Sequence, residues 1–140
     1  MKRMILIVSI GAAVALMGTA LARLVAAQTP KKDMAVVDLT DKTKMMKEVL
    51  QGKYIFVHDE EAMAKGQPCF YVYKYGQDAA GKPEIKPENL VLSFNCQHLE
   101  RSKAPQIVIT YTMVPGNADL FEIKEVQFAG STAVHRLPNS

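Results

Sequence analysis

Cys69 and Cys96 are the residues whose types and spacing point most directly to a chemical role. Cys69 opens one stretch typical of a β-strand, 69–75, and Cys96 closes another, 89–96, with the polar loop 76–88 between them. If these strands pair as a hairpin, the cysteines lie near the same end of it, where a disulfide can join them. The functional alternatives are a redox pair or metal-binding thiolates, and a redox pair usually has the spacing Cys-x-x-Cys, which is absent here. We therefore predict a structural disulfide, Cys69–Cys96.

The three histidines of the chain, His58, His98 and His135, could bind a metal. Imidazole, thioether and thiolate groups are ligands of copper and of haem iron, so the histidines could form such a site with Met63 or a cysteine. The candidate metal or haem set is His58, Met63 and His135. No His-x-His, His-x₃-His or Cys-x-x-Cys-His spacing supports this set. We favour one or two partly buried histidines bonded to the backbone, and one exposed. A metal or haem site stays the alternative, and no cofactor is predicted.

Tyr71, Tyr73 and Tyr75 alternate along one face of the strand 69–75. Such a row can stack on sugars or flat ligands and leave its hydroxyls for hydrogen bonds. It can equally cover a neighbouring strand, and the absence of tryptophan weakens a carbohydrate-binding interpretation. Packing is the favoured interpretation, but any ligand-facing surface is expected here.

Other motifs indicate structure more than catalysis. The run 59–61 is acidic, and Asp59 is suited to cap a helical turn over 62–66, with Glu60 and Glu61 favoured by its N-terminal dipole. This explanation accounts for the run better than a cation site does. Neither Gly-x-Ser-x-Gly nor His-Glu-x-x-His occurs in the sequence. We therefore expect a protein that is not an enzyme.

The N-terminal stretch 1–27 reads as a secretory signal peptide: Lys2 and Arg3, then an uncharged run over 4–22, then small residues up to Ala27. The chain carries 17 basic and 14 acidic residues, a net charge of +3. Three basic residues and no acidic one lie in 1–27, so the remaining chain is neutral and lacks the basic surface of a nucleic-acid binder. Export to the periplasm or the extracellular space would also favour the disulfide.

An uncleaved leader is the alternative, because the 19-residue run 4–22 approaches the length of about 20 residues that spans a bilayer. The rest divides into a lead-in segment, 28–40, and a single small β-rich domain, 41–138. A chain of this length supports one core.

Periodicity predicts a mainly β fold of four to six antiparallel strands with one or two short helices, after an N-terminal apolar signal helix. The architecture would be a small meander, a half-open barrel or a sandwich. An amphipathic helix is expected over 42–51 because Met45, Met46, Val49 and Leu50 share a helical face. Strands are expected at 53–58, 69–75, 89–96, 106–114 and 120–128, with weaker edge strands at 33–39 and 132–137 and a charged loop at 98–104. In 120–128 the apolar alternation changes phase, which predicts a β-bulge near Lys124 or Glu125.

These observations predict an exported, disulfide-bonded, non-enzymatic domain that acts by binding or assembly. Its partner would be an unidentified protein or small ligand, not nucleic acid. The first alternative is a periplasmic metal- or haem-binding protein with histidine and methionine ligands. The second is a membrane-tethered accessory subunit that keeps its leader.

Overall fold

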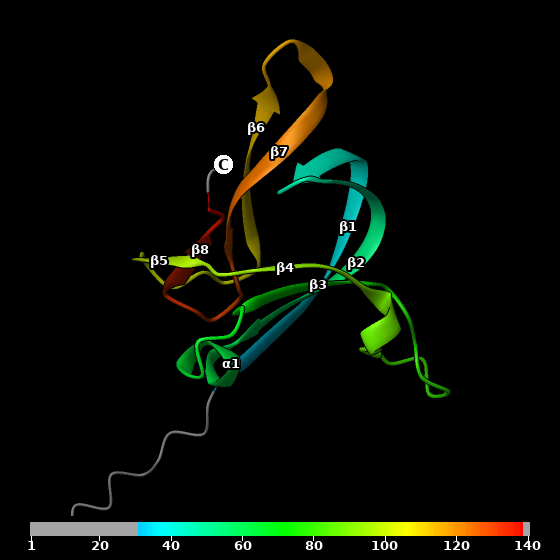
Figure 1. The fold of residues 1–140 in the computed structure, drawn as a ribbon, viewed down its shortest axis with the longest axis vertical. Coiled ribbons are helices and arrows are strands. Elements are labelled where there is room, and N and C mark those ends of the chain that lie inside the picture. The colour runs from blue at the N-terminus through cyan, green and yellow to red at the C-terminus, as the bar shows by residue number, and fades with distance from the viewer. Residues whose placement is uncertain (1–30, 139–140) are drawn as a thin grey trace, which may run out of the picture.

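The computed structural model describes residues 31–138, and their main feature is one curled, mostly antiparallel sheet of eight strands (Figure 1). The strands are β1 (Lys32–Met45), β2 (Glu48–Asp59), β3 (Phe70–Lys74), β4 (Leu90–Phe94), β5 (Gln97–Glu100), β6 (Val108–Val114), β7 (Asn117–Gln127) and β8 (Ala133–Arg136). One helical turn, α1 (Glu60–Ala64), and one 3₁₀ turn, Pro87–Asn89, accompany them. The predicted signal helix lies outside the described residues.

The sheet has the order β4-β3-β2-β1-β7-β8-β5, and β6 pairs with β7 as well. One link is parallel: Thr43 and Lys44 of β1 pair with Phe121 and Glu122 of β7. The sheet curls into a half-barrel, with the β1–β2 and β6–β7 turns in the upper part of Figure 1. The mainly β prediction is confirmed, but residues 31–138 contain eight strands instead of the expected four to six.

The core lies inside the curl, where the alternate residues of each strand meet. Four phenylalanines form its centre, and Phe70 contacts the rings of the other three, Phe56, Phe94 and Phe128. Aliphatic and sulfur-containing side chains extend this core toward both ends: Val37, Leu39, Met45, Leu50, Cys69, Val72, Ile123, Val126 and Leu137.

The helix predicted over 42–51 is wrong, because this segment forms the turn between β1 and β2. Met45 pairs with Glu48 across the turn residues Met46 and Lys47. Met45 and Leu50 are buried as a helical face would require, but they reach the core from two paired strands. Met46 has a positive φ of 58°, a conformation rare for this residue type. The turn residues Met46 and Lys47 are not the Asn-Gly pair that usually marks such a hairpin turn. The sequence therefore gives no turn signal here, and the spacing of its apolar residues favours a helix instead.

The β-bulge predicted in β7 is present at Lys124. Thr110 and Tyr111 are consecutive on β6, yet their partners Glu125 and Ile123 are two residues apart on β7. The extra residue shifts by one position the set of residues that face the core. Ile123 before the bulge and Val126 after it therefore both point into the core.

Three smaller predictions also change. Residues from Lys32 onward, treated as a lead-in or edge strand, belong to β1, which lies between β2 and β7. The expected loop at 98–104 begins with β5, which Gln97–Glu100 forms against β8. The C-terminal strand β8 is not an edge, because it pairs with β7 on its other side. Short strands such as β5 carry too few residues to show an alternation.

The helical turn α1 is confirmed together with its cap. Asp59 accepts hydrogen bonds from the backbone N–H groups of Glu61 and Ala62, at 3.0 and 3.1 Å. Over 31–138, no helix has both the length and the apolar character needed to cross a membrane.

Candidate metal centre

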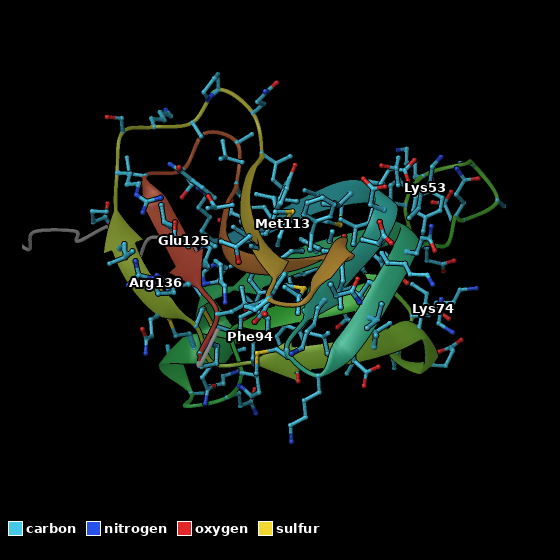
Figure 2. All side chains as sticks on the ribbon, turned by 90° about the horizontal axis from the view of Figure 1, so that it is seen from above. Lys53, Lys74, Phe94, Met113, Glu125 and Arg136 are labelled. Atoms are coloured by element: carbon cyan, nitrogen blue, oxygen red, sulfur yellow. A yellow bond between two sulfur atoms is a disulfide. The ribbon has the colours of Figure 1, made fainter. Side chains whose placement is uncertain are left out.

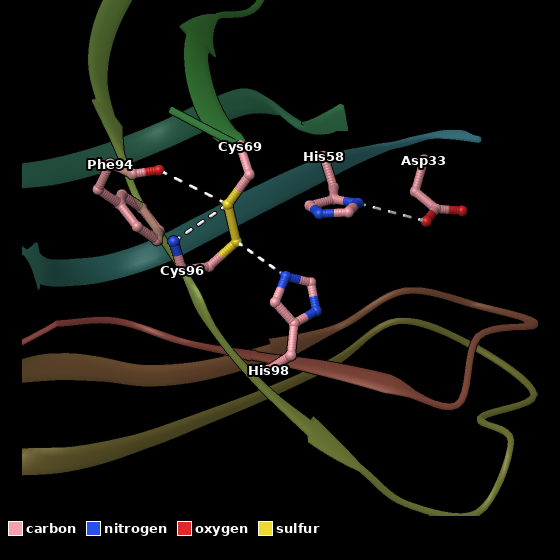
Figure 3. The surroundings of a disulfide bond; sticks show 6 residues. All are labelled: Asp33, His58, Cys69, Phe94, Cys96 and His98. Carbon is pink, nitrogen blue, oxygen red and sulfur yellow. Dashed lines mark hydrogen bonds and ion pairs between the residues drawn. A yellow bond between two sulfur atoms is a disulfide. The ribbon is translucent and has the colours of Figure 1, made fainter. Parts of the chain in front are cut away.

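The predicted disulfide Cys69–Cys96 joins the residue before β3 to a residue after β4, with Cα atoms 6.3 Å apart. β3 and β4 pair directly, as the hairpin prediction requires. Cys69 is buried, and its sulfur lies 3.8 Å from the carbonyl oxygen of Phe94. The backbone N–H of Cys96 points at the same sulfur from 3.0 Å (Figure 3). The bond therefore ties the start of β3 to the end of β4.

The three histidines of the chain meet beside this disulfide, although they come from three strands. His58 lies near the end of β2, where it pairs with Asp33 on β1 and Phe70 on β3. His98 on β5 and His135 on β8 are direct cross-strand partners. The curl of the sheet brings β5 and β8 over the end of β2, so the three imidazoles share one end of the core.

The rings are in contact with one another. His58 and His135 stack with centroids 4.0 Å apart. His98 approaches both edge-on, at 5.5 Å from His58 and 4.8 Å from His135. Phe70 and Phe128 border His135 from the core, at 6.1 and 5.8 Å.

Burial without hydrogen bonding distinguishes His58 and His135. Their exposed fractions are 2% and 0%, and within residues 31–138 no group hydrogen-bonds to any of their four ring nitrogens. The interpretation in which buried histidines bond to the backbone is therefore wrong for both. A buried polar group without a partner destabilises a fold by about 1–3 kcal/mol, so such groups call for an explanation.

The protonation states of His58 and His135 suit metal binding. Burial, followed by the neighbouring His58 and His98, lowers the pKa of His135 to about 3. Burial and His98 also lower the pKa of His58, while Asp33 opposes the shift. Both imidazoles are therefore neutral at physiological pH, which is the form that coordinates a metal.

The possible ligand atoms are close enough to share one ion. One nitrogen from each imidazole and the sulfur of Cys96 all lie within 4.8 Å of one another. Nitrogens bound to one zinc ion are separated by about 3.3 Å, so modest side-chain rotations would close the set. His98 is exposed, which leaves an approach from solvent. Asp33 places a carboxylate oxygen 3.9 Å from His58 Nδ1, in the position of an outer carboxylate partner (Figure 3).

The sequence-based metal set of His58, Met63 and His135 is thus brought together in part. His58 and His135 stack, and His98, which that set omitted, completes the cluster. Met63 lies on α1, is 41% exposed and borders a hollow beside the disulfide. Alternation could have shown that His58 shares the inward face of β2 with Phe56, but no local signal reveals that β5 and β8 reach it.

The tyrosine row lies on the outer face of the sheet. The rings of Tyr71 and Tyr73 are 6.4 Å apart, and their cross-strand neighbours on β2 are Val57 and Ile55, both buried. Tyr75 follows β3 and accepts a 2.6 Å hydrogen bond from the Gln77 side chain. Tyr71 and Tyr73 thus flank apolar side chains that would otherwise face solvent.

Comparison with known proteins gives no relative from which a function could be transferred: no family model, curated protein or solved structure matches the chain.

Proposed function

We propose that this protein binds a late first-row transition metal ion, such as zinc or copper, through His58, His98 and His135. The observation that carries the proposal is the stacked pair of buried imidazoles whose nitrogens have no hydrogen-bond partner in residues 31–138. Neutral imidazole is a common ligand of these ions. A bound ion would give His58 and His135 the partner they lack.

Zinc or copper suits the cluster better than haem. His58 and His135 lie face to face with centroids 4.0 Å apart, which leaves no room for a porphyrin between them. Three histidines leave at least one coordination position for water or an incoming ligand. The exposed edge at His98 is where that position would open.

The proposed role is binding in an exported protein, with no reaction assigned to the site. The Cys69–Cys96 bond is compatible with an oxidising compartment, and the leader-like stretch 1–27 supports export. The Tyr71–Tyr73 face remains a second surface at which a partner could bind.

The test is to titrate the exported protein with Zn²⁺, Cu²⁺ and Co²⁺. Calorimetry measures the affinity, and native mass spectrometry counts the ions bound. We expect one ion per chain. His98→Ala should lower the affinity for metal more than about 100-fold, because losing a direct ligand should cost more than losing a residue that only hydrogen-bonds to a ligand. His98 is exposed, so this substitution leaves the core intact.

Two matched variants control the experiment. Gln97→Ala changes the exposed neighbour of His98 on β5 and should bind as the unaltered protein does. Met63→Leu separates the three-histidine set from a set that includes the thioether, and it should also retain affinity. Equal affinities in the unaltered protein and His98→Ala would overturn the proposal, and a loss in Met63→Leu would place the ion elsewhere.

A further inference from the structure

The sulfur of Cys96 lies at the edge of the histidine cluster, 3.6 Å from His98 Nε2 (Figure 3). It belongs to the set of ligand atoms that all lie within 4.8 Å of one another. In a tetrahedral zinc site, a nitrogen and a sulfur on the same ion are also separated by about 3.6 Å. The sulfur therefore stands where a fourth ligand would stand, but in the disulfide it carries no charge to offer a metal.

We propose that reduction of Cys69–Cys96 converts the three-histidine site into a three-histidine, one-thiolate site, with Cys96 as the fourth ligand. This inference rests on the proposed function. It makes the affinity for metal dependent on the thiol redox state around the protein. Thiolate is a softer and stronger ligand than water, so zinc and monovalent copper gain most.

Cys96 and Cys69 have different surroundings, and these assign the ligand role to Cys96. Cys69 is 2% exposed and packs in the core, with its sulfur facing the Phe94 carbonyl and the Cys96 N–H. Cys96 is half-buried, and its sulfur faces His98. Once the bond is broken, Cys69 can stay as a buried thiol while Cys96 turns to the imidazoles.

The reaction needs a reductant, which we identify by class as a dithiol. One thiolate of the dithiol attacks a sulfur of the Cys69–Cys96 bond and forms a mixed disulfide; its second thiolate then closes a disulfide within the reductant. Two electrons pass to the protein, and two protons give the thiols of Cys69 and Cys96. The Cys96 thiol releases its proton when it binds the metal.

A reductant has a route to the bond. Cys69 and Cys96 both border an open hollow of about 260 Å³, which Gln67 and Asn95 also line. This hollow is the one that Met63 also borders.

Metal binding and reduction must then favour each other. If reduction raises the affinity for metal by a given factor, bound metal raises the equilibrium constant for reduction by the same factor. The redox equilibrium of the disulfide is therefore a second readout of the same coupling.

The experiment compares Cys69→Ser with Cys96→Ser, because both lack the disulfide but only the first keeps a sulfur beside His98. Each variant and the oxidised unaltered protein are titrated with Co²⁺. We expect Cys69→Ser to bind at least about 10-fold more tightly than Cys96→Ser and the oxidised protein. It should also show a near-ultraviolet sulfur-to-cobalt charge-transfer band that both others lack.

The outcomes separate this inference from the proposed function. Binding by the oxidised protein, without a charge-transfer band or a gain of affinity in Cys69→Ser, overturns the thiolate ligand and leaves the three-histidine site standing. If neither the oxidised protein nor Cys69→Ser binds Co²⁺, both proposals are overturned.

Circular dichroism covers the case in which Cys69→Ser unfolds. The site exists only in the folded chain, so Co²⁺ should then restore the β spectrum together with the charge-transfer band. An unfolded variant that Co²⁺ does not rescue counts against the inference.

Discussion

The imidazoles of His58 and His135 stack 4.0 Å apart at the end of the phenylalanine core, and no group in residues 31–138 hydrogen-bonds to their nitrogens. In the metal-free protein this arrangement destabilises the fold, because both rings lost water and gained no partner. Metal binding therefore favours histidine at position 135, whereas stability of the metal-free fold favours an apolar residue there.

We expect His135→Leu to stabilise the metal-free protein by about 1–3 kcal/mol while abolishing metal binding. Leucine is close to histidine in size and removes two unpaired ring nitrogens from a fully buried position. Urea unfolding in the presence of a chelator measures the change. The matched control is Phe128→Leu, a buried neighbour with no polar atom, which should destabilise instead. A destabilised His135→Leu protein would show that the imidazole has a structural role.

Asp33 offers a test of the support around His58. Its carboxylate oxygen lies 3.9 Å from His58 Nδ1, across the paired strands β1 and β2. Outer carboxylate partners orient a metal-bound imidazole, and their loss lowers affinity by about 10–100-fold. We expect Asp33→Asn to weaken zinc binding within this range in calorimetry. Asp38→Asn, an exposed change on the same strand, should leave it unaltered.

The disulfide has a measurable share in stability. Cys69 and Cys96 are separated by 27 residues in sequence, and closing a loop of this length contributes about 3.5 kcal/mol by restricting the unfolded chain. We expect the double variant Cys69→Ala, Cys96→Ala to lose roughly this free energy of unfolding in chelator. A change below about 1 kcal/mol would mean that the bond restricts the unfolded chain far less than its loop length predicts.

Glu125 holds together the strands that carry His98 and His135. Its carboxylate accepts hydrogen bonds from Arg101, at 2.6 and 3.2 Å, and from Arg136, at 3.2 and 2.9 Å. Figure 2 shows Glu125 and Arg136 next to each other on β7 and β8. The hydrogen bonds from Arg101 and then Arg136 hold the pKa of Glu125 below its usual value of 4.5.

This lowered pKa fixes the direction of a pH effect. The folded state favours the carboxylate, so the stabilisation is complete above the unfolded value of 4.5 and is lost as the pH falls through the lower folded value. We expect Glu125→Gln to lose about 1–2 kcal/mol at neutral pH, because both arginine groups are about half exposed. The free energies of unfolding of Glu125→Gln and of the unaltered protein, measured against pH, should become equal in acid. Glu122→Gln, which loses one lysine contact on the same strand, should show a smaller difference.

Local patterns in the sequence predicted what depends on neighbours along the chain: the hairpin that carries the disulfide, the cap at Asp59 and the bulge in β7. They did not predict the β1–β2 turn, because Met46 adopts a positive φ that is rare for methionine and that the residue type does not indicate. Of the histidine cluster, His58 and His135 were named with Met63 as an alternative metal set, but their contact with each other and with His98 was not predicted, for a different reason. His58 meets His98 and His135 through the curl of the sheet, and curvature is set by packing over the whole molecule.

The bulge at Lys124 gives the sharpest test of how the sequence fixes this fold. With strict alternation through β7, either Phe121 and Ile123 or Val126 and Phe128 would face solvent, whereas Ile123, Val126 and Phe128 all belong to the core. We expect deletion of Lys124 to cost more than about 4 kcal/mol and to abolish the cooperative thermal transition. Deletion of Ala79, in the exposed loop between β3 and β4, is the control and should leave a folded protein. If the Lys124 deletion melted like the unaltered protein, the register of β7 would have to be set by its pairing with β8 and not by the apolar phase.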